Sequence, residues 1–236
     1  KILLFGEYGV IRDAMALSIP YTSFSGVLRM PEGEASFAER ESNASLNRFA
    51  SYLEELAALG SLMADLDLSA LRADIDRGLF FDSSIPQGYG VGSSGAMVAA
   101  LYARYARNPL PLEEAHDAEK LKALKAEMAQ MECYFHGKSS GMDPTICYLQ
   151  LPLLVRSSEE LGTVRMPSLP SDGLGGIFLL NSGTPGETQP MVQLFMEKLK
   201  EEGFRRLMTD RFKKYNDACV AAFLDGKTDV LLRELK

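Results

Sequence analysis

Hydrophobic and polar positions along the chain predict strands and hairpins in its first part and mainly helices in its last part. Short apolar runs at 2–11 and 16–30, each interrupted by a turn, predict two pairs of strands. Residues 41–66 predict an amphipathic helix of about 15 residues or more, with one apolar stripe facing the core. The stripe recurs at spacings of three and four residues: Leu46, Phe49, Leu53 and Leu56.

The segments that follow show the same two patterns. A strand is predicted over 71–86, helices over 96–108 and 111–137, and an extended run over 144–155. Gly137 is placed to end the second of these helices as its C′ residue. Strands come first in hairpins and helices pack afterwards, which favours an α+β fold over a doubly wound parallel sheet.

A passage rich in Ser, Glu and Pro over 157–173 is the best candidate for a domain boundary. Beyond it, a buried strand is predicted over 175–183 and helices over most of the remaining residues. We therefore expect an N-terminal, nucleotide-binding domain over 1–160 and a C-terminal domain over 174–236. The second domain is expected to be incomplete in this sequence.

The most informative run is PQGYGVGSSGAM at 86–97, between a strand-like segment and a helix-like one. Its glycines permit backbone turns that bring successive N–H groups to one anion, and Ser93 and Ser94 would cap the helix that follows. The N-terminus of that helix also favours phosphate. The run lacks the lysine of the Walker pattern and the third glycine of the dinucleotide fingerprint. On the loop alone, phosphate binding and a structural turn both remain open.

The amino-acid composition limits the classes of partner and the cellular compartment expected for the protein. The 25 basic and 32 acidic residues give a net charge of −7, which argues against nucleic acid or an anionic membrane as the main partner. The three cysteines form no CxxC pair, which argues against a disulfide framework or a structural zinc site. No run approaches 18 apolar residues without a charge. We expect a cytoplasmic protein that acts on a small molecule, and the sequence leaves open whether it forms a homodimer.

Three runs, in this order, resemble the GHMP kinase superfamily, the small-molecule kinases named for galactose, homoserine, mevalonate and phosphomevalonate. The opening KILLFGEYGV resembles the mevalonate kinase segment K-x-x-L-x-G-E-H-A-V. The glycine loop is similar to P-x-G-x-G-L-G-S-S-A, with Val91 for Leu and Gly95 for Ala. HGKSSGMD at 136–143 resembles the mevalonate branch's H-G-x-P-S-G-x-D, and a weaker echo lies at 181–192. The resemblance implies a two-domain α+β fold with the active site in the cleft between the domains.

The resemblance also implies the parts needed for phosphoryl transfer from ATP. Asp143 is similar to the aspartate that takes the proton from the substrate hydroxyl, and Lys1 to the lysine that stabilises charge beside it. Ser94 and Glu132 match the residues that bind Mg²⁺, an ion that prefers oxygen ligands. The residues expected to hold the ATP phosphates are Pro86, Gly88, Gly90, Val91, Gly92, Ser93, Ser94 and Gly95.

The same motifs imply a set of substrate-side residues: Glu7, Tyr8, His136, Lys138, Ser140 and Thr188. Tyr8 replaces the histidine usual in mevalonate kinases, which leaves the substrate contacts at this position open. Without the resemblance, Glu132 also fits a solvated helix position, Asp143 an ordinary turn before proline, and His136 a helix C-terminus.

We therefore expect a kinase that uses ATP and Mg²⁺ to phosphorylate the hydroxyl of a small molecule. Mevalonate is the first candidate, which would place the protein in isoprenoid biosynthesis. Phosphomevalonate, homoserine or a sugar is the alternative acceptor. A binding protein that kept the fold without catalysis is the alternative of a different class.

Overall fold

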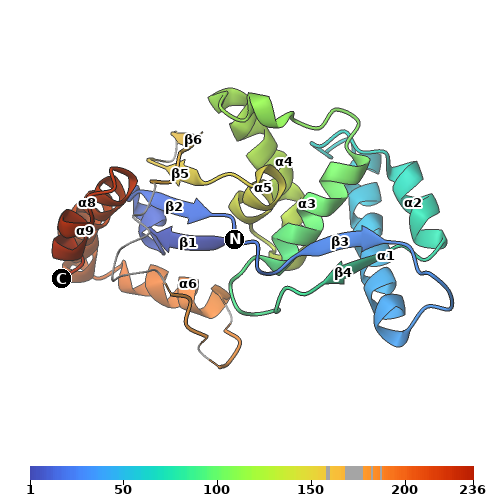
Figure 1. Ribbon diagram of the computed structural model, residues 1–236, viewed down its shortest axis with the longest axis horizontal. Coiled ribbons are helices and arrows are strands. Elements are labelled where there is room, and N and C mark those ends of the chain that lie inside the picture. Colours follow the sequence, from blue (N-terminus) through green and yellow to red (C-terminus); the bar gives the residue numbers. More distant parts are fainter. Residues whose placement is uncertain (158–159, 168–177, 182, 187) are drawn as a thin grey trace. The chain divides into compact units, whose positions relative to one another are not determined.

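A computed structural model describes residues 1–157, 160–167, 178–181, 183–186 and 188–236 of the chain (Figure 1). The chain divides into two compact units. The first unit comprises Lys1, Tyr21–Pro86 and Val91–Gln150, and the second comprises Ile2–Pro20, Gln87–Gly90 and Leu151–Lys236. The glycine-rich run therefore contributes residues to both units.

Helices form most of the first unit, which also contains a pair of antiparallel strands. In chain order its elements are β3 (Gly26–Arg29), α1 (Phe37–Ala58), α2 (Leu68–Asp76), β4 (Phe80–Ser83), α3 (Ser93–Tyr105), η2 (Leu112–Glu114), α4 (Ala118–His136) and α5 (Met142–Leu149). Strands β3 and β4 pair although α1 and α2 separate them in sequence, with Gly26 opposite Ser83 and Arg29 opposite Phe80. Helices α3, α4 and α5 pack on one another, which positions the residues of the candidate site.

The start and the buried face of α1 follow from local sequence. Ser36 Oγ accepts a hydrogen bond from the Glu39 N–H (3.3 Å), and the Glu39 carboxylate accepts one from the Ser36 N–H (2.6 Å). This reciprocal capping box satisfies two donors that the helix itself cannot pair. The predicted apolar stripe is confirmed, with Leu56 half-buried and three members fully buried: Leu46, Phe49 and Leu53.

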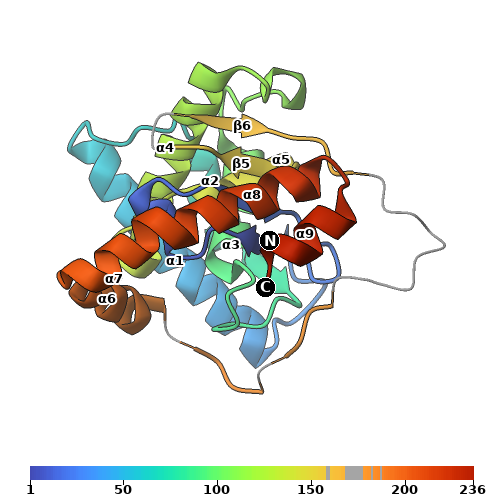
Figure 2. The same ribbon diagram turned by 90° about the vertical axis from the view of Figure 1, so that its left-hand side faces the viewer.

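The second unit contains a four-stranded antiparallel sheet in the order β1-β2-β5-β6, together with the C-terminal helices. Its elements are β1 (Ile2–Phe5), η1 (Gly9–Arg12), β2 (Ala16–Ile19), β5 (Leu153–Val155), β6 (Leu161–Thr163), α6 (Thr188–Lys198), α7 (Glu202–Arg206), η3 (Leu207–Phe212), α8 (Lys213–Leu224) and α9 (Thr228–Glu234). Figure 2 shows α7 continuing into α8, and the π-helical turn η3 joins them. The sheet and α8 share a core made by Leu17, Leu154, Val220 and Phe223.

Several strand predictions are wrong in part. Residues 16–30 do hold two strands, but β2 pairs with β1 and β3 pairs with β4, so the two lie in different sheets. Gly9–Arg12 forms the 3₁₀ turn η1, so the strand that returns to β1 is β2. Within the segment 175–183, residues 178–181 and 183 are described and form no strand.

The strand predicted over 71–86 is confirmed only in its second half. Helix α2 occupies this segment as far as Asp76, and β4 begins at Phe80. The helix is favoured because Asp67 caps it, with its carboxylate accepting a hydrogen bond from the Ala70 N–H (3.0 Å). Alternation of apolar and polar residues therefore did not separate a short helix from the strand that follows it.

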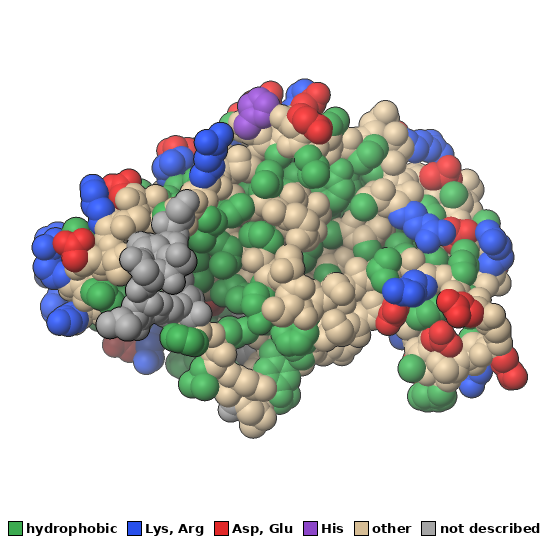
Figure 3. Space-filling view, viewed as in Figure 1, with side chains coloured by type: hydrophobic (Ala, Val, Ile, Leu, Met, Phe, Trp, Pro, Cys, Tyr) green, Lys and Arg blue, Asp and Glu red, His purple; other side chains and the backbone are tan. Residues whose placement is uncertain are grey.

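The predicted α+β class is confirmed, because the protein combines helices with two sheets whose strands are all antiparallel. In the part of the chain that the structure describes, no helix has the length and apolar character needed to cross a membrane. On the face seen in Figure 3, acidic and basic side chains are interspersed, and neither sign forms a broad patch there.

Candidate functional site

The glycine-rich run adopts the backbone conformations that its sequence predicts. Gly88, Gly90 and Gly92 have φ angles of +79°, +69° and +83°, a region that residues with side chains rarely adopt. Gly92 is the N-cap of α3, and the helix begins at Ser93. The prediction that Ser93 and Ser94 cap this helix is therefore wrong, because the left-handed Gly92 takes the cap position and both serines lie in the first turn.

Asp143 and Lys1 form an ion pair beside this loop. Lys1 Nζ lies 3.1 Å from Asp143 Oδ1, and the Lys1 side chain is only 14% exposed. The backbone nitrogen of Lys1 donates to the carbonyl oxygen of Val91 (3.0 Å), which fixes the lysine to the loop. A Cβ at Gly92 would lie 3.3 Å from Lys1 Cγ and 3.5 Å from Asp143 Oδ2. Glycine at position 92 thus leaves room for the pair.

Asp143 lies in the first turn of α5, where the sequence predicted a turn and an extended run over 144–155. Gly141, with a φ of +72°, is the N-cap of the helix. Pro144 fits the first turn because an N–H at this position would have no partner within the helix. The carboxylate of Asp143 is also favoured there by the positive end of the helix dipole.

The N-termini of α3 and α5 approach each other very closely. A Cβ at Gly95, in the first turn of α3, would lie 2.8 Å from the Asp143 carbonyl carbon and 2.8 Å from the Pro144 nitrogen. These are backbone atoms, which cannot move aside as a side chain can. The absence of a side chain at Gly95 therefore allows Asp143 to lie next to the start of α3.

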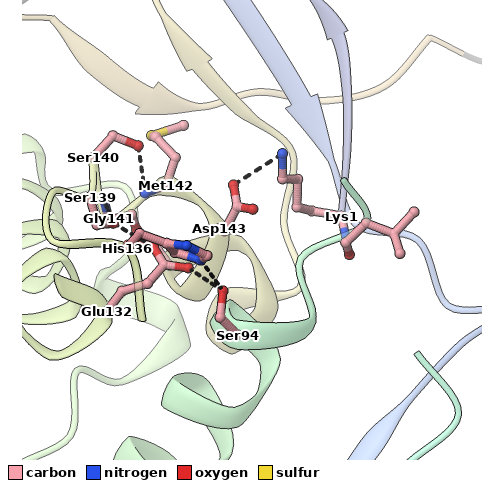
Figure 4. A network of polar contacts seen from close by, with 11 residues as sticks. Lys1, Ser94, Glu132, His136, Ser139, Ser140, Gly141, Met142 and Asp143 are labelled. Carbon is pink, nitrogen blue, oxygen red and sulfur yellow. Dashed lines mark hydrogen bonds and ion pairs between the residues drawn. The ribbon is translucent and has the colours of Figure 1, made fainter. Parts of the chain in front are cut away.

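Glu132, near the end of α4, is the buried acid of the site. It is 4% exposed, and its Oε1 accepts a hydrogen bond from Ser94 Oγ (3.0 Å). Its Oε2 accepts one from Ser139 Oγ, and His136 Nε2 lies 2.9 Å from Ser94 Oγ. Figure 4 shows Asp143 between this cluster and Lys1. Glu132 is thus a buried group and not the solvated helix residue of the alternative interpretation.

Burial raises the pKa of Glu132 above its usual range. The hydroxyl of Ser139 opposes this shift, the negative charge of Asp143 adds to it, and the hydroxyl of Ser94 opposes it again. Burial likewise raises the pKa of Cys147 to about 11, and the charges of Asp143 and Glu132 add to the increase. The Cys147 thiol is therefore neutral at physiological pH and unsuited to act as a nucleophile.

Residues 47–150 match the family model described as the GHMP kinases N terminal domain. This match supports the GHMP kinase superfamily. The matched region includes the glycine loop, Glu132 and Asp143, and it excludes Lys1. A comparison with curated proteins finds none that matches the chain.

The matched region brings some of the predicted substrate-side residues to the site. His136 ends α4 with its ring against Ser94, and Gly137 terminates this helix as predicted. Lys138 is exposed, and the exposed Ser140 accepts a hydrogen bond from the Met142 N–H (3.3 Å) at the start of α5.

Other predicted residues belong to the second unit. Gly88 and Gly90 are exposed there, and the Gly88 carbonyl oxygen accepts a hydrogen bond from the Gly186 N–H (2.8 Å). Glu7 is exposed, and the ring of Tyr8 stacks on Phe195 at 5.3 Å between centroids. Thr188 is the first residue of α6, and its side chain lies outside the described part of the structure.

Sequence reasoning missed Ser139, whose hydroxyl hydrogen-bonds to the carboxylate of Glu132. A signal was present in the run HGKSSGMD, since the related motif H-G-x-P-S-G-x-D has proline at this position. Proline carries no side-chain donor, so the departure from the motif adds a hydrogen-bond donor within the site.

The residues of the matched region fit the Mg²⁺ and ATP that GHMP kinases generally use. Within the described ranges, no three His, Cys, Asp or Glu side chains gather as a metal-binding cluster. Ser94 and Glu132 instead offer two oxygen donors side by side, and Mg²⁺ commonly takes few protein ligands and completes its shell with water and phosphate oxygens. The space around the Cα of Gly90 is open, which suits a loop that approaches phosphate closely.

Proposed function

We propose that the protein transfers the γ-phosphoryl group of ATP to the hydroxyl of a small molecule, with mevalonate as the first candidate acceptor. The GHMP domain supports a kinase of this family. The observation that carries the proposal is the ion pair of Lys1 and Asp143 at 3.1 Å, next to the glycine loop and the Ser94–Glu132 pair. Phosphoryl transfer needs a base or positioning group and positive charge at the same place.

In this proposal Asp143 acts on the acceptor hydroxyl. Its Oδ1 is paired with Lys1, whereas its Oδ2 accepts no hydrogen bond from any described residue. Oδ2 is therefore available to take the hydroxyl proton as the oxygen attacks phosphorus. Lys1 would hold the carboxylate in place and stabilise the negative charge that develops on the acceptor oxygen.

Ser94 and Glu132 would hold Mg²⁺, and the loop from Pro86 to Gly95 would hold the phosphates of ATP. The bound ion would neutralise charge on the transferred group. Glu132 is buried against its two hydroxyl partners, which gives its carboxylate a fixed orientation. We further propose the two-domain arrangement of the superfamily, with domains over 1–160 and 174–236 and the active site in the cleft between them.

The choice of acceptor rests on the substrate-side residues. Mevalonate is favoured by the resemblance of the runs that contain Glu7 and His136 to the mevalonate kinase motifs. A phosphorylated acceptor would need additional cationic groups, and HGKSSG supplies only Lys138. Tyr8, Ser140 and Thr188 complete the proposed substrate-side set, in which an aromatic ring at position 8 replaces the imidazole of the related motif.

The proposal is tested by measuring ADP release with mevalonate, phosphomevalonate, homoserine, galactose and other sugars. We expect release with at least one acceptor, and we expect Asp143→Asn to lower kcat by roughly 10²–10⁴-fold with little change in ATP affinity. Asp82→Asn, in an exposed ion pair with Arg29 of the same unit, serves as the matched control and should retain turnover. Near wild-type turnover in Asp143→Asn would refute the role of Asp143. ATP binding without turnover on any acceptor would indicate a binding protein instead.

A further inference from the structure

The two carboxylate oxygens of Glu132 have different partners. Ser94 Oγ donates to Oε1 (3.0 Å) and also lies 2.9 Å from His136 Nε2, which donates or accepts according to the tautomer of the ring. Ser139 Oγ is the partner of Oε2. A carboxylate that is 4% exposed depends on such donors, because water does not replace them.

The direction of the Ser139 hydroxyl is fixed by a second hydrogen bond. The Gly141 N–H donates to Ser139 Oγ (2.9 Å), so one lone pair of this oxygen is occupied and its proton points to Glu132. Gly141 itself packs closely on α4: a Cβ at this position would lie only 2.8 Å from the Ala129 nitrogen. Ser139 therefore links the start of α5 to the buried acid of α4.

We propose that Ser139 is a positioning residue, which holds Oε2 of Glu132 so that Oε1 stays aligned with Ser94. This inference rests on the proposed function, which assigns Mg²⁺ to Ser94 and Glu132. A freely rotating Glu132 would present its oxygens to the ion in several orientations, whereas the Ser139 hydrogen bond selects one. Groups that orient metal ligands in this way commonly change metal affinity by about 10–100-fold when removed.

The test measures metal binding without turnover. Mn²⁺ is titrated into the protein with ATP and no acceptor, and bound Mn²⁺ is followed by electron paramagnetic resonance. We expect Ser139→Ala to weaken Mn²⁺ binding about tenfold or more and Ser139→Thr, which keeps the hydroxyl, to restore it. In the kinase assay, the Mg²⁺ concentration for half-maximal rate should rise by a similar factor, while kcat at saturating Mg²⁺ changes much less.

Ser42→Ala is the matched control. The half-buried Ser42 likewise accepts a backbone N–H, from Phe81 (2.9 Å), and donates to an oxygen, the Phe81 carbonyl (3.0 Å). Its loss should leave Mn²⁺ binding unchanged. If Ser139→Ala does not fold, Ser139→Cys keeps a similar shape with a weak donor and carries the same expectation.

The outcomes separate this inference from the proposed function. Wild-type Mn²⁺ binding by Ser139→Ala, together with weakened binding by Glu132→Gln, would overturn the role of Ser139 and leave the metal site in place. Unchanged binding by Glu132→Gln would overturn the metal site and the role of Ser139 with it. Equal weakening by Ser139→Ala and Ser42→Ala would show a general loss of structure and would also overturn the positioning role.

Discussion

Each unit of the protein contains a lysine–aspartate pair at the same distance, and the two pairs differ in what surrounds them. Lys1 Nζ and Asp143 Oδ1 lie 3.1 Å apart in the first unit, and Lys213 Nζ and Asp217 Oδ2 lie 3.1 Å apart in the second. The Lys1 side chain is 14% exposed and that of Lys213 is 37% exposed. Distance alone therefore does not distinguish a candidate catalytic pair from a structural one.

The neighbours of the second pair are all backbone or amide groups of its own unit. Asp217 Oδ1 accepts hydrogen bonds from the Met15 N–H (2.7 Å) and from Asn216 Nδ2 (3.1 Å), and Lys213 Nζ donates to the Asp13 carbonyl oxygen. These contacts attach α8 to the segment before β2. The first pair instead keeps one oxygen without a described partner and adjoins a glycine loop. The contacts of the second pair therefore fit a structural role, and the oxygen of Asp143 without a described partner fits the proposed site.

Substitution of each lysine in turn tests whether the two ion pairs differ in function. Lys1→Met should lower kcat/KM by roughly 10²–10³-fold, because the variant lacks the charge that we propose stabilises the developing oxyanion. Lys213→Met should keep turnover near wild type and lower the free energy of unfolding by about 1 kcal/mol, as for one hydrogen-bonded contact. Steady-state ADP release and urea unfolding measure the two effects. A similar loss of turnover in both variants would contradict the distinction between the pairs.

A second comparison uses two glycines in helices, one in each unit. Gly95→Ala places a methyl group 2.8 Å from backbone atoms of Asp143 and Pro144, so it should lower the free energy of unfolding by roughly 1–3 kcal/mol. It should also reduce turnover, since displacement of a reacting group by about 1 Å can cost 10²-fold.

Gly203, in α7, is the matched control because a Cβ there would meet no described atom within 4 Å apart from its own chain neighbours and helix backbone. Gly203→Ala should stabilise the protein by about 0.5–1 kcal/mol, the gain expected from helix propensity. Thermal and urea unfolding report both changes. A Gly95→Ala variant as stable and active as wild type would mean that the two helix starts do not depend on their close approach.

Much of the first unit was predictable because its signals are local. The glycine loop, the helix after it and the end of α4 at Gly137 follow from turn residues and apolar periodicity. The short helix α5 was not predictable in this way. Its eight residues are too few for periodicity to separate helix from strand, and the segment contains the β-branched Thr145 and Ile146.

The contacts of the second unit could not be predicted because they join residues far apart in sequence. Asp217 and Met15 are separated by 202 positions, and neither lies in a motif. Tyr8 has a φ of +56°, a conformation that nothing in the run GEYGV requires of a tyrosine. Ser139 lay within a recognised motif, but its hydrogen bond to the buried Glu132 could be seen only in the structure.

The two units also differ in the pKa of their buried carboxyl groups. Among the described residues, Glu127 and Glu132 are the carboxyl groups whose pKa lies above its usual value, with burial as the main cause, and both lie on α4 of the first unit. Glu127 is half-buried, and hydrogen bonding from the Tyr102 hydroxyl opposes the effect of burial. Glu127 lies outside the proposed site, so it provides a test of burial without loss of a metal ligand.

The smallest predicted effect is therefore a pH dependence of stability at Glu127. Because its pKa is raised in the folded protein, the folded state holds the proton more tightly than the unfolded chain does. Stability should fall as pH rises above about 4.3, the usual Glu value, and level off above the folded pKa. Glu127→Gln removes this contribution, so its stability relative to wild type should increase with pH across that window.

Urea unfolding at several pH values measures the difference, with Glu119→Gln, 85% exposed on the same helix, as control. A relative stability of Glu127→Gln that stays constant or falls with rising pH would contradict the penalty for burying this carboxylate.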